Sequence, residues 1–402
     1  MKLLIVHEVN YLEKIIYEFQ ILPEILSMFG HDVVIIDYDD SWKGSTNGNG
    51  RGLKTRVYEH VHRAYPEAHV TVRRPGMIRV PGLSRVSAAV TSGLEVNRLL
   101  SNEKVDAILL YGLPTVGLQT LLAARRFGVP IFFRSIDVLN QLVPFRSLAA
   151  VTRIMERFIY PRVDAVFPLT LDLKKHIVSC GVPESRIRVL PSGVDTRMFS
   201  PGPRDVKLLQ KWGIGAEDPV ILFMGTIYKF SGLDRVITAF PRLVSRYANV
   251  RLLIVGCGED EQRLKNLSAQ TGMSNHVIFG GLHPYPALVD IVRSSDVCIN
   301  PFELNNITRD ILPTKLFQYL ACGKPVVATE LPGTIPFLTG EEHGVVYSTL
   351  DGFTDCIGDL LAEPARREEL GRRGVEITRK NYEWSRIAET MVSWIEEIRE
   401  SV

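Results

Sequence analysis

The sequence is poor in cysteine, with five in 402 residues, and no two of them form a C-x-x-C pair. An odd number of scattered cysteines excludes a disulfide framework and argues against a structural zinc site. The same usage fits the reducing environment of the cytoplasm.

Net charge and long hydrophobic runs are also lacking. Lys and Arg number 47 against 45 Asp and Glu, so the global charge indicates no polyanionic partner such as a nucleic acid.

The apolar run after Met1 is too short for a secretory signal. Residues 107–124 carry no charge, but a Tyr-Gly-Leu-Pro-Thr turn at 111–115 interrupts them. We expect a strand, a turn and a helix there rather than a membrane span. The protein is therefore expected in the cytoplasm, attached peripherally to the inner face of the membrane if it meets one.

Short apolar runs alternate with stretches long enough for a helix in both halves of the chain. The runs lie at 3–6, 33–36, 107–110, 130–133 and 165–168, and again at 220–224, 250–255, 277–279, 297–300 and 325–328. Runs this apolar indicate parallel strands covered on both faces. The sequence therefore predicts two doubly wound α/β domains, over 1–198 and 199–383, with a C-terminal helix over 384–402 that packs back on the first.

The turns after two second-half strands are candidate ligand loops. Gly225 and Thr226 follow one strand and precede a helix, and Gly256 and Gly258 follow the next. In open parallel sheets, ligands bind outside the carboxyl ends of the strands, where glycine lets the backbone approach them closely. The chain has no P-loop, no H-E-x-x-H and no G-x-S-x-G motif, which argues against those three kinds of site.

A further helix is expected to open at Pro313 and to end at Gly323. Thr314 and Lys315 then lie in its first turn, where free backbone N–H groups and an ammonium would make a diphosphate site. A solvated surface lysine is the alternative interpretation of Lys315.

Read together, the second-half motifs resemble the nucleotide-sugar half of retaining family 4 (group 1) glycosyltransferases, which have the GT-B fold. The matching pieces, in family order, are IRVLPSGVDTRMFSP from 187, FMGT from 223, LIVGCGE from 253, VIFGG from 277, SDVCINP from 295 and KLFQYLACGKPVVA from 315. The resemblance implies two Rossmann-like doubly wound domains facing a central cleft. It implies transfer of a sugar from a nucleoside diphosphate sugar to a glycan or lipid-linked acceptor, with retention and with neither metal nor cofactor.

Mapped residue by residue, the resemblance assigns donor binding to a set of loop residues. They are Gly225, Thr226, Lys229, Ser231, Gly256, Gly258, Leu282, Asn305, Arg309, Thr314, Lys315 and Gln318. Thr226 and Ser231 stand where the family usually has Arg and Lys. The family's two spaced glutamates fall on Asp310, which implies contact with the donor sugar, and on Gln318, which implies contact with the ribose. Lys315, with Lys229 and Arg309, would replace the missing basic pair.

Asp137 is the candidate catalytic residue of the first domain, with Asp310 as its counterpart in the second. Asp137 follows a strand at the position of the family's aspartate, although Ile136 replaces the usual histidine. A carboxylate there would orient or deprotonate an acceptor hydroxyl. A helix N-cap is the alternative role.

Basic residues gather in residues 41–90, which hold nine Arg and Lys against two Glu. The segment looks like a long irregular insertion after the second strand, and Arg73, Arg74, Arg79 and Arg85 are its candidate contacts with an anionic membrane or acceptor. A solvated loop remains the alternative. Arg146, Arg153 and Arg157 share one side of a predicted helix. Two interpretations of this side stay open: a solvated face, or a contact with an acceptor phosphate.

Two other functions remain open from the sequence. One is a sugar-nucleotide epimerase or hydrolase on the same fold, and the other is a nucleotide-sugar-binding partner without activity, an idea that the substitutions at Thr226, Ser231 and Gln318 motivate. No metal is expected at His60, His62 and His69, because their surroundings are basic.

Overall fold

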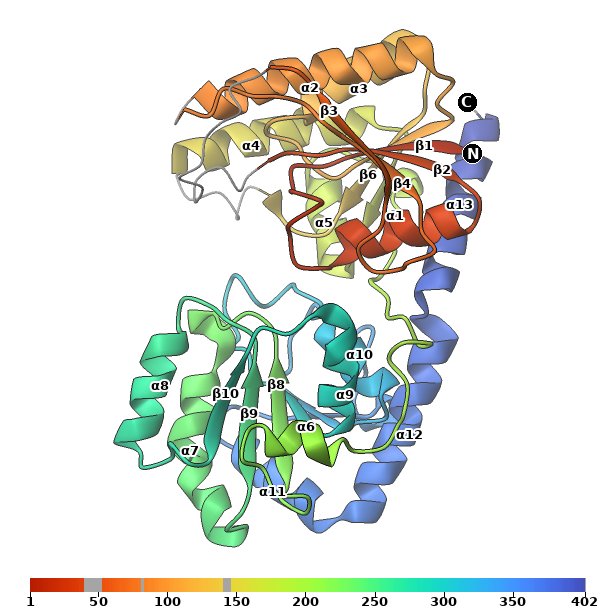
Figure 1. Ribbon diagram of the computed structural model, residues 1–402. Helices are drawn as coiled ribbons and strands as arrows, with labels where there is room; N and C mark the ends of the chain where they lie inside the picture. Colours follow the sequence, from red (N-terminus) through yellow and green to blue (C-terminus); the bar gives the residue numbers. More distant parts are fainter. Residues whose placement is uncertain (40–52, 81–82, 140–145, 402) are drawn as a thin grey trace. The chain divides into compact units, whose positions relative to one another are not determined.

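The computed structural model describes residues 1–39, 53–80, 83–139 and 146–401, and these form two compact units (Figure 1). The first comprises residues 1–191 and 387–402, and the second comprises residues 192–386. The boundary therefore falls seven residues before the expected position at 198. Lys43 and Arg51 of the basic segment lie outside the described residues.

The first unit is built on a seven-stranded sheet with the order β3-β4-β2-β1-β5-β6-β7. Its strands are β1 (Lys2–Val6), β2 (Asp32–Ile36), β3 (Arg56–Val61), β4 (Val70–Arg74), β5 (Ala107–Leu110), β6 (Ile131–Ser135) and β7 (Ala165–Pro168). All neighbours pair in parallel except β3 with β4. This antiparallel pair lies where an irregular insertion was expected, and the burial of Val70 and Val72 holds it on the sheet.

Helices cover both faces of this sheet, as the apolar strands require. Figure 1 shows α2 (Leu83–Asn102), α3 (Gly117–Phe127) and α4 (Arg146–Ile159) side by side on one face, with α1 (Glu18–Met28) and α5 (Leu171–Ser179) on the other. Residues 107–124 form β5, a turn and the start of α3, as expected. Among the described residues, no helix is both long and apolar enough to span a bilayer.

The C-terminal helix α13 (Trp384–Ser401) contributes most of its length to the first unit. Its Trp394 ring lies 5.7 Å from that of Phe167 in β7, and Arg399 pairs with Asp106 at 3.1 Å.

The second unit has an all-parallel six-stranded sheet with the order β10-β9-β8-β11-β12-β13. Its strands are β8 (Val220–Met224), β9 (Arg251–Val255), β10 (Val277–Gly281), β11 (Val297–Asn300), β12 (Val326–Ala328) and β13 (Val345–Tyr347). Its helices are α6 (Val206–Gln210), α7 (Leu233–Arg246), α8 (Glu261–Gln270), α9 (Leu288–Arg293), α10 (Lys315–Ala321), α11 (Phe353–Ala362) and α12 (Pro364–Asn381). The strand order reverses between β8 and β11, the place where open α/β sheets bind ligands.

Candidate functional site

Lys315 is the first residue of α10 and points its side chain into the second unit. Its Nζ atom is buried and has no hydrogen-bond partner among the described residues. Nζ lies 3.9 Å from the centroid of the Phe223 ring and 4.4 Å from that of Phe302. Burial lowers the pKa of the Lys315 ammonium to about 7, because the charged form loses its hydration there. Lys315 is therefore a buried amine that titrates near neutral pH and has no hydrogen-bond partner among the described residues.

Lys315 faces the end of β8. A Cβ atom built on Gly225 would lie 3.3 Å from Lys315 Nζ, and the backbone of Gly225 has a φ of +132° that side chains rarely adopt. Glycine at this position lets the backbone adopt this conformation and lets the Lys315 amine lie close beside it.

Gly256 and Gly258 pack closely against neighbouring backbone, and their predicted contact with the donor stays a prediction. A Cβ atom on Gly256 would lie 2.0 Å from the carbonyl oxygen of Gly225, and one on Gly258 would lie 2.2 Å from that of Ile227. These glycines allow the β9 loop to pack against the β8 loop. Direct approach to a ligand is therefore not what requires glycine at 256 and 258.

Two further polar side chains near this strand end lack partners among the described residues. Asn300 ends β11 and is fully buried, and neither its Oδ1 nor its Nδ2 makes a hydrogen bond. The buried Oγ of Ser231 also makes no hydrogen bond to any described residue. Gly232, next to Ser231, packs against the carbonyl oxygen of Pro301. Because buried polar groups usually find partners, these groups mark a place for a polar ligand. Asn300 was missed in the sequence, where a lone polar residue ending an apolar strand was the available signal.

The loop after β11 is held by its own hydrogen bonds. Asn305 Oδ1 accepts from the N–H groups of Ile307 at 2.8 Å and Thr308 at 3.1 Å, so this predicted donor ligand is engaged in its own turn. Arg309 and Asp310 form an ion pair at 3.3 Å and are both partly exposed.

The remaining predicted donor residues lie on the loops at the same sheet edge. Thr314 is the N-cap residue of α10, although its hydroxyl makes no capping bond. Gln318, one turn further on, forms a hydrogen bond with the Tyr285 hydroxyl. Lys229 and Leu282 are exposed, and Thr226 is partly buried.

In the first unit, Asp137 follows β6 and is the predicted catalytic carboxylate. Burial, together with the nearby charge of Glu18, raises the pKa of Asp137 to about 6. Glu18 is fully buried and pairs with Arg134 through two hydrogen bonds, of 2.6 and 2.9 Å. The alternative role of Asp137 as a helix N-cap stays open, because residues 140–145 lie outside the described residues.

The four arginines of the basic segment are all paired with carboxylates, and their predicted contact with a membrane or an acceptor stays a prediction. Their carboxylate partners come from other parts of the unit: Arg73 pairs with Glu95 and Glu103, Arg74 with Asp37, Arg79 with Asp39, and Arg85 with Glu8. Arg74 is buried. A charge count along the sequence omitted these partners because they are distant in the chain.

Comparison with known proteins adds to this geometry. Residues 206–376 match the model of the glycosyl transferases group 1 family, and residues 24–193 match that of the glycosyl transferase 4-like domain. These two regions span most of the chain. The chain belongs to the group 1 (family 4) glycosyltransferases, and its two units have the GT-B fold.

Among curated relatives, a GDP-mannose-dependent alpha-(1-6)-phosphatidylinositol monomannoside mannosyltransferase of Mycolicibacterium smegmatis is 30% identical over 256 residues, 61% of this chain and 66% of its own length. A D-inositol 3-phosphate glycosyltransferase of Acidothermus cellulolyticus is 27% identical over 63% of this chain and 59% of its own length. The chain thus spans less than two thirds of the length of these relatives.

Solved structures match over nearly the whole chain. A glycosyltransferase from Rickettsia africae has a TM-score of 0.75 at 14% identity, with 99% of this chain and 98% of that one covered. Anabaena Alr3699/HepE in complex with UDP-glucose has a TM-score of 0.73 at 15% identity, with all of both chains covered. At this identity the likeness establishes the fold alone.

Proposed function

We propose that this protein transfers a glycosyl group from a nucleoside diphosphate sugar to an acceptor hydroxyl, with retention and without a metal in the transfer. The observation that carries the proposal is the buried side chain of Lys315, whose Nζ has no hydrogen-bond partner among the described residues and lies beside Gly225 at the end of β8.

A buried ammonium without a partner is costly, and an anion that reaches it restores the lost interaction. A diphosphate is the anion that fits, because the site lies at the strand reversal of a doubly wound sheet. In the transfer, negative charge develops on the leaving diphosphate, and a fixed ammonium in a desolvated site stabilises it. The unpartnered amide of Asn300 and hydroxyl of Ser231 supply further hydrogen bonds to the donor.

In the first unit, Asp137 acts on the acceptor hydroxyl. Its pKa of about 6 makes it ionised at neutral pH while still basic enough to accept a proton. Asp310 contacts the donor sugar, as the family pattern implies. Gln318, held by Tyr285, contacts the ribose through its neutral amide.

The acceptor in this proposal is lipid-linked. The Mycolicibacterium relative is named for a phosphatidylinositol mannoside acceptor and for GDP-mannose as donor, which makes an anionic lipid the first acceptor class to test and GDP-mannose the first donor. UDP-glucose, bound by the Anabaena protein, is the second donor.

Exposed apolar side chains on the outer side of α2, α3 and α4 support attachment to a membrane. They are Leu83, Val86, Val90 and Leu94 on α2, Leu118 and Leu122 on α3, and Val151, Ile154 and Phe158 on α4. The exposed charges of these helices are arginines, among them Arg98, Arg153 and Arg157, and both of their described glutamates, Glu95 and Glu156, are buried. An apolar surface with positive charge and no exposed acid fits an anionic leaflet. In this proposal the membrane surface includes the end of the expected segment, where Leu83, Val86 and Val90 lie on α2, and extends to α3 and α4.

The test is release of nucleoside diphosphate from each donor, with and without a lipid extract. The proposal expects release that depends on the extract, together with a radiolabelled lipid product. Release without any acceptor would identify a hydrolase, isomerised donor an epimerase, and binding without release a partner protein without activity.

A further inference from the structure

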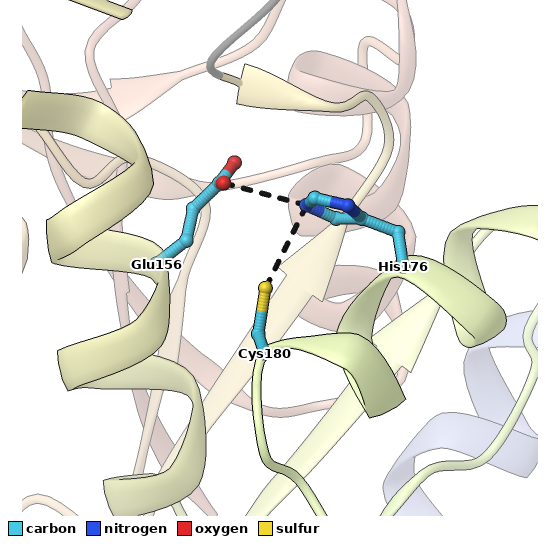
Figure 2. Close-up of side chains that lie close together, drawn as sticks. All are labelled: Glu156, His176 and Cys180. Atoms are coloured by element: carbon cyan, nitrogen blue, oxygen red, sulfur yellow. Dashed lines mark hydrogen bonds and ion pairs between the residues drawn. The ribbon is translucent and has the colours of Figure 1, made fainter. Parts of the chain in front are cut away.

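Three side chains from α4 and α5 converge within the first unit (Figure 2). Glu156 lies on α4, His176 on α5, and Cys180 directly after α5, four residues beyond His176. His176 Nε2 lies 3.3 Å from Glu156 Oε2 and 3.8 Å from Cys180 Sγ, and the three atoms all lie within 4.8 Å of one another. Glu156 and Cys180 are buried, and about a quarter of the His176 side chain is exposed.

The arrangement is not that of a nucleophilic relay. In a relay, the histidine contacts the nucleophile through one ring nitrogen and the orienting carboxylate through the other. Here one nitrogen, Nε2, faces both the thiol and the carboxylate. The three donor atoms therefore point at one shared position, as the ligands of a metal ion do.

We propose that Glu156, His176 and Cys180 bind one Zn²⁺ ion, which links α4 to α5. Thiolate, imidazole and carboxylate together form a ligand set that Zn²⁺ prefers, whereas Mg²⁺ and Ca²⁺ select oxygen. Typical bond lengths to zinc and a tetrahedral angle place neighbouring ligand atoms about 3.4–3.6 Å apart. The observed 3.3 and 3.8 Å require only small side-chain movements.

Without metal, the two neighbouring side chains favour the protonated imidazole. The Cys180 and Glu156 side chains raise the pKa of His176 to about 9, so the imidazole is held there as a cation. Zinc would displace this proton and that of the Cys180 thiol into the solvent. Because about a quarter of the His176 side chain is exposed, the cluster lies near the surface, and a water molecule would be the fourth ligand of the proposed ion.

The sequence does not reveal this site. His176 and Cys180 are one helical turn apart, but Glu156 comes from another helix, and the expected absence of a zinc site considered only paired cysteines. The proposed ion is structural and independent of the transfer reaction, so its test does not depend on activity.

The full chain, without a polyhistidine tag, is treated with EDTA, dialysed, equilibrated with a slight excess of ZnCl₂ and freed of unbound metal. Zinc is then measured by mass spectrometry, and unfolding is followed by differential scanning fluorimetry. We expect about one zinc per chain, and a rise in Tm of roughly 5–10 °C at a hundredfold excess over the Kd. Cys180→Ser and His176→Ala should each weaken zinc binding at least tenfold. Cys356→Ser, which changes a thiol in α11 of the second unit, is the matched control and should keep the zinc.

If these variants fail to fold, binding of Co²⁺ to the wild-type chain tests the proposed site. Co²⁺ bound to the wild-type chain should give an intense near-ultraviolet band from thiolate-to-metal charge transfer. A wild-type chain with neither zinc nor this band would overturn the proposal. Full retention of zinc in a folded Cys180→Ser variant would overturn it as well.

Discussion

Lys315 and Phe223 form a buried cation–π pair, with Nζ 3.9 Å from the ring centroid. The aromatic face offsets part of the hydration that the ammonium loses, but it supplies no hydrogen bond. The N–H donors of the charged amine make no hydrogen bond to any described residue. The amine lies between the aromatic rings and the backbone of Gly225, so a bound anion would be the first hydrogen-bond acceptor that it meets.

Gly225→Ala tests the side of the Lys315 amine that faces Gly225. The new methyl group would lie 3.3 Å from Lys315 Nζ, so nucleotide affinity should fall about tenfold or more, measured by calorimetry. Gly272→Ala is the matched control, because Gly272 also has a positive φ but has nothing within 4 Å of the added carbon. Both variants should lose roughly 1 kcal/mol of stability from backbone strain. Equal nucleotide affinity in the two variants would show that the space beside Lys315 is not used.

Asp137→Asn tests the catalytic carboxylate. Turnover should fall about 10²-fold or more, because an amide cannot accept the proton of the acceptor hydroxyl. In the wild-type enzyme, turnover should fall as the pH drops below about 6, where Asp137 becomes protonated. Near-normal turnover in the variant, with the acidic limb unchanged, would make Asp137 a structural residue.

The same raised pKa predicts an effect of Asp137 on stability. Above about pH 6 the folded chain holds a disfavoured ionised carboxylate, whereas below the ordinary pKa of 3.8 both states are protonated and the penalty vanishes. Asp137→Asn should therefore raise the free energy of unfolding by roughly 1–3 kcal/mol at pH 8 and by less at pH 5. Chemical denaturation at the two pH values measures the difference, and an equal effect at both would contradict the assigned burial.

The apolar periodicity was sufficient to predict both sheets, since β1, β8 and β11 are runs that only a two-sided parallel sheet can bury. It missed β3, β4 and β13, because β3 is mostly exposed, β4 alternates buried with half-buried residues, and β13 has only three residues.

At the candidate site, the predicted start of the helix was enough to place Lys315 in its first turn. The sequence did not predict that the Lys315 amine is buried without a hydrogen-bond partner among the described residues. Burial and pairing depend on which segments meet in three dimensions. The same limit explains why Arg74 was taken for a surface charge: Asp37, on a different strand, neutralises it.

Arg134→Met should destabilise the first unit strongly. Removing this fully buried guanidinium leaves the Glu18 carboxylate buried without its partner, which costs about 3–5 kcal/mol. The double variant with Glu18→Gln should recover part of the loss, because no charge then remains buried. Urea denaturation of both variants measures this, and a single variant as stable as the wild type would contradict the role of the pair.

Vesicle co-sedimentation tests the membrane surface on α2, α3 and α4. The wild-type chain should bind anionic vesicles and be released by high salt. Ile154→Ser with Phe158→Ser should weaken binding about tenfold or more, because two inserted apolar side chains are lost. Val57→Ser, an exposed apolar residue of β3, is the control and should have no effect. A wild-type chain that stays in the supernatant at low salt would refute membrane attachment.

Proton uptake on nucleotide binding tests the central claim, that Lys315 holds the donor diphosphate. At pH 8 most of the free Lys315 amine is neutral, since its pKa is about 7, and a bound diphosphate should restore its proton. Titration calorimetry in buffers of different ionisation enthalpy should therefore show uptake of nearly one proton, and affinity should fall as the pH rises above 7. Lys315→Met should abolish the uptake and lower affinity at pH 7 about tenfold or more. Lys324→Met, which changes a second lysine whose pKa burial lowers, should leave both unchanged. Full affinity and undiminished proton uptake in a folded Lys315→Met variant would contradict the account.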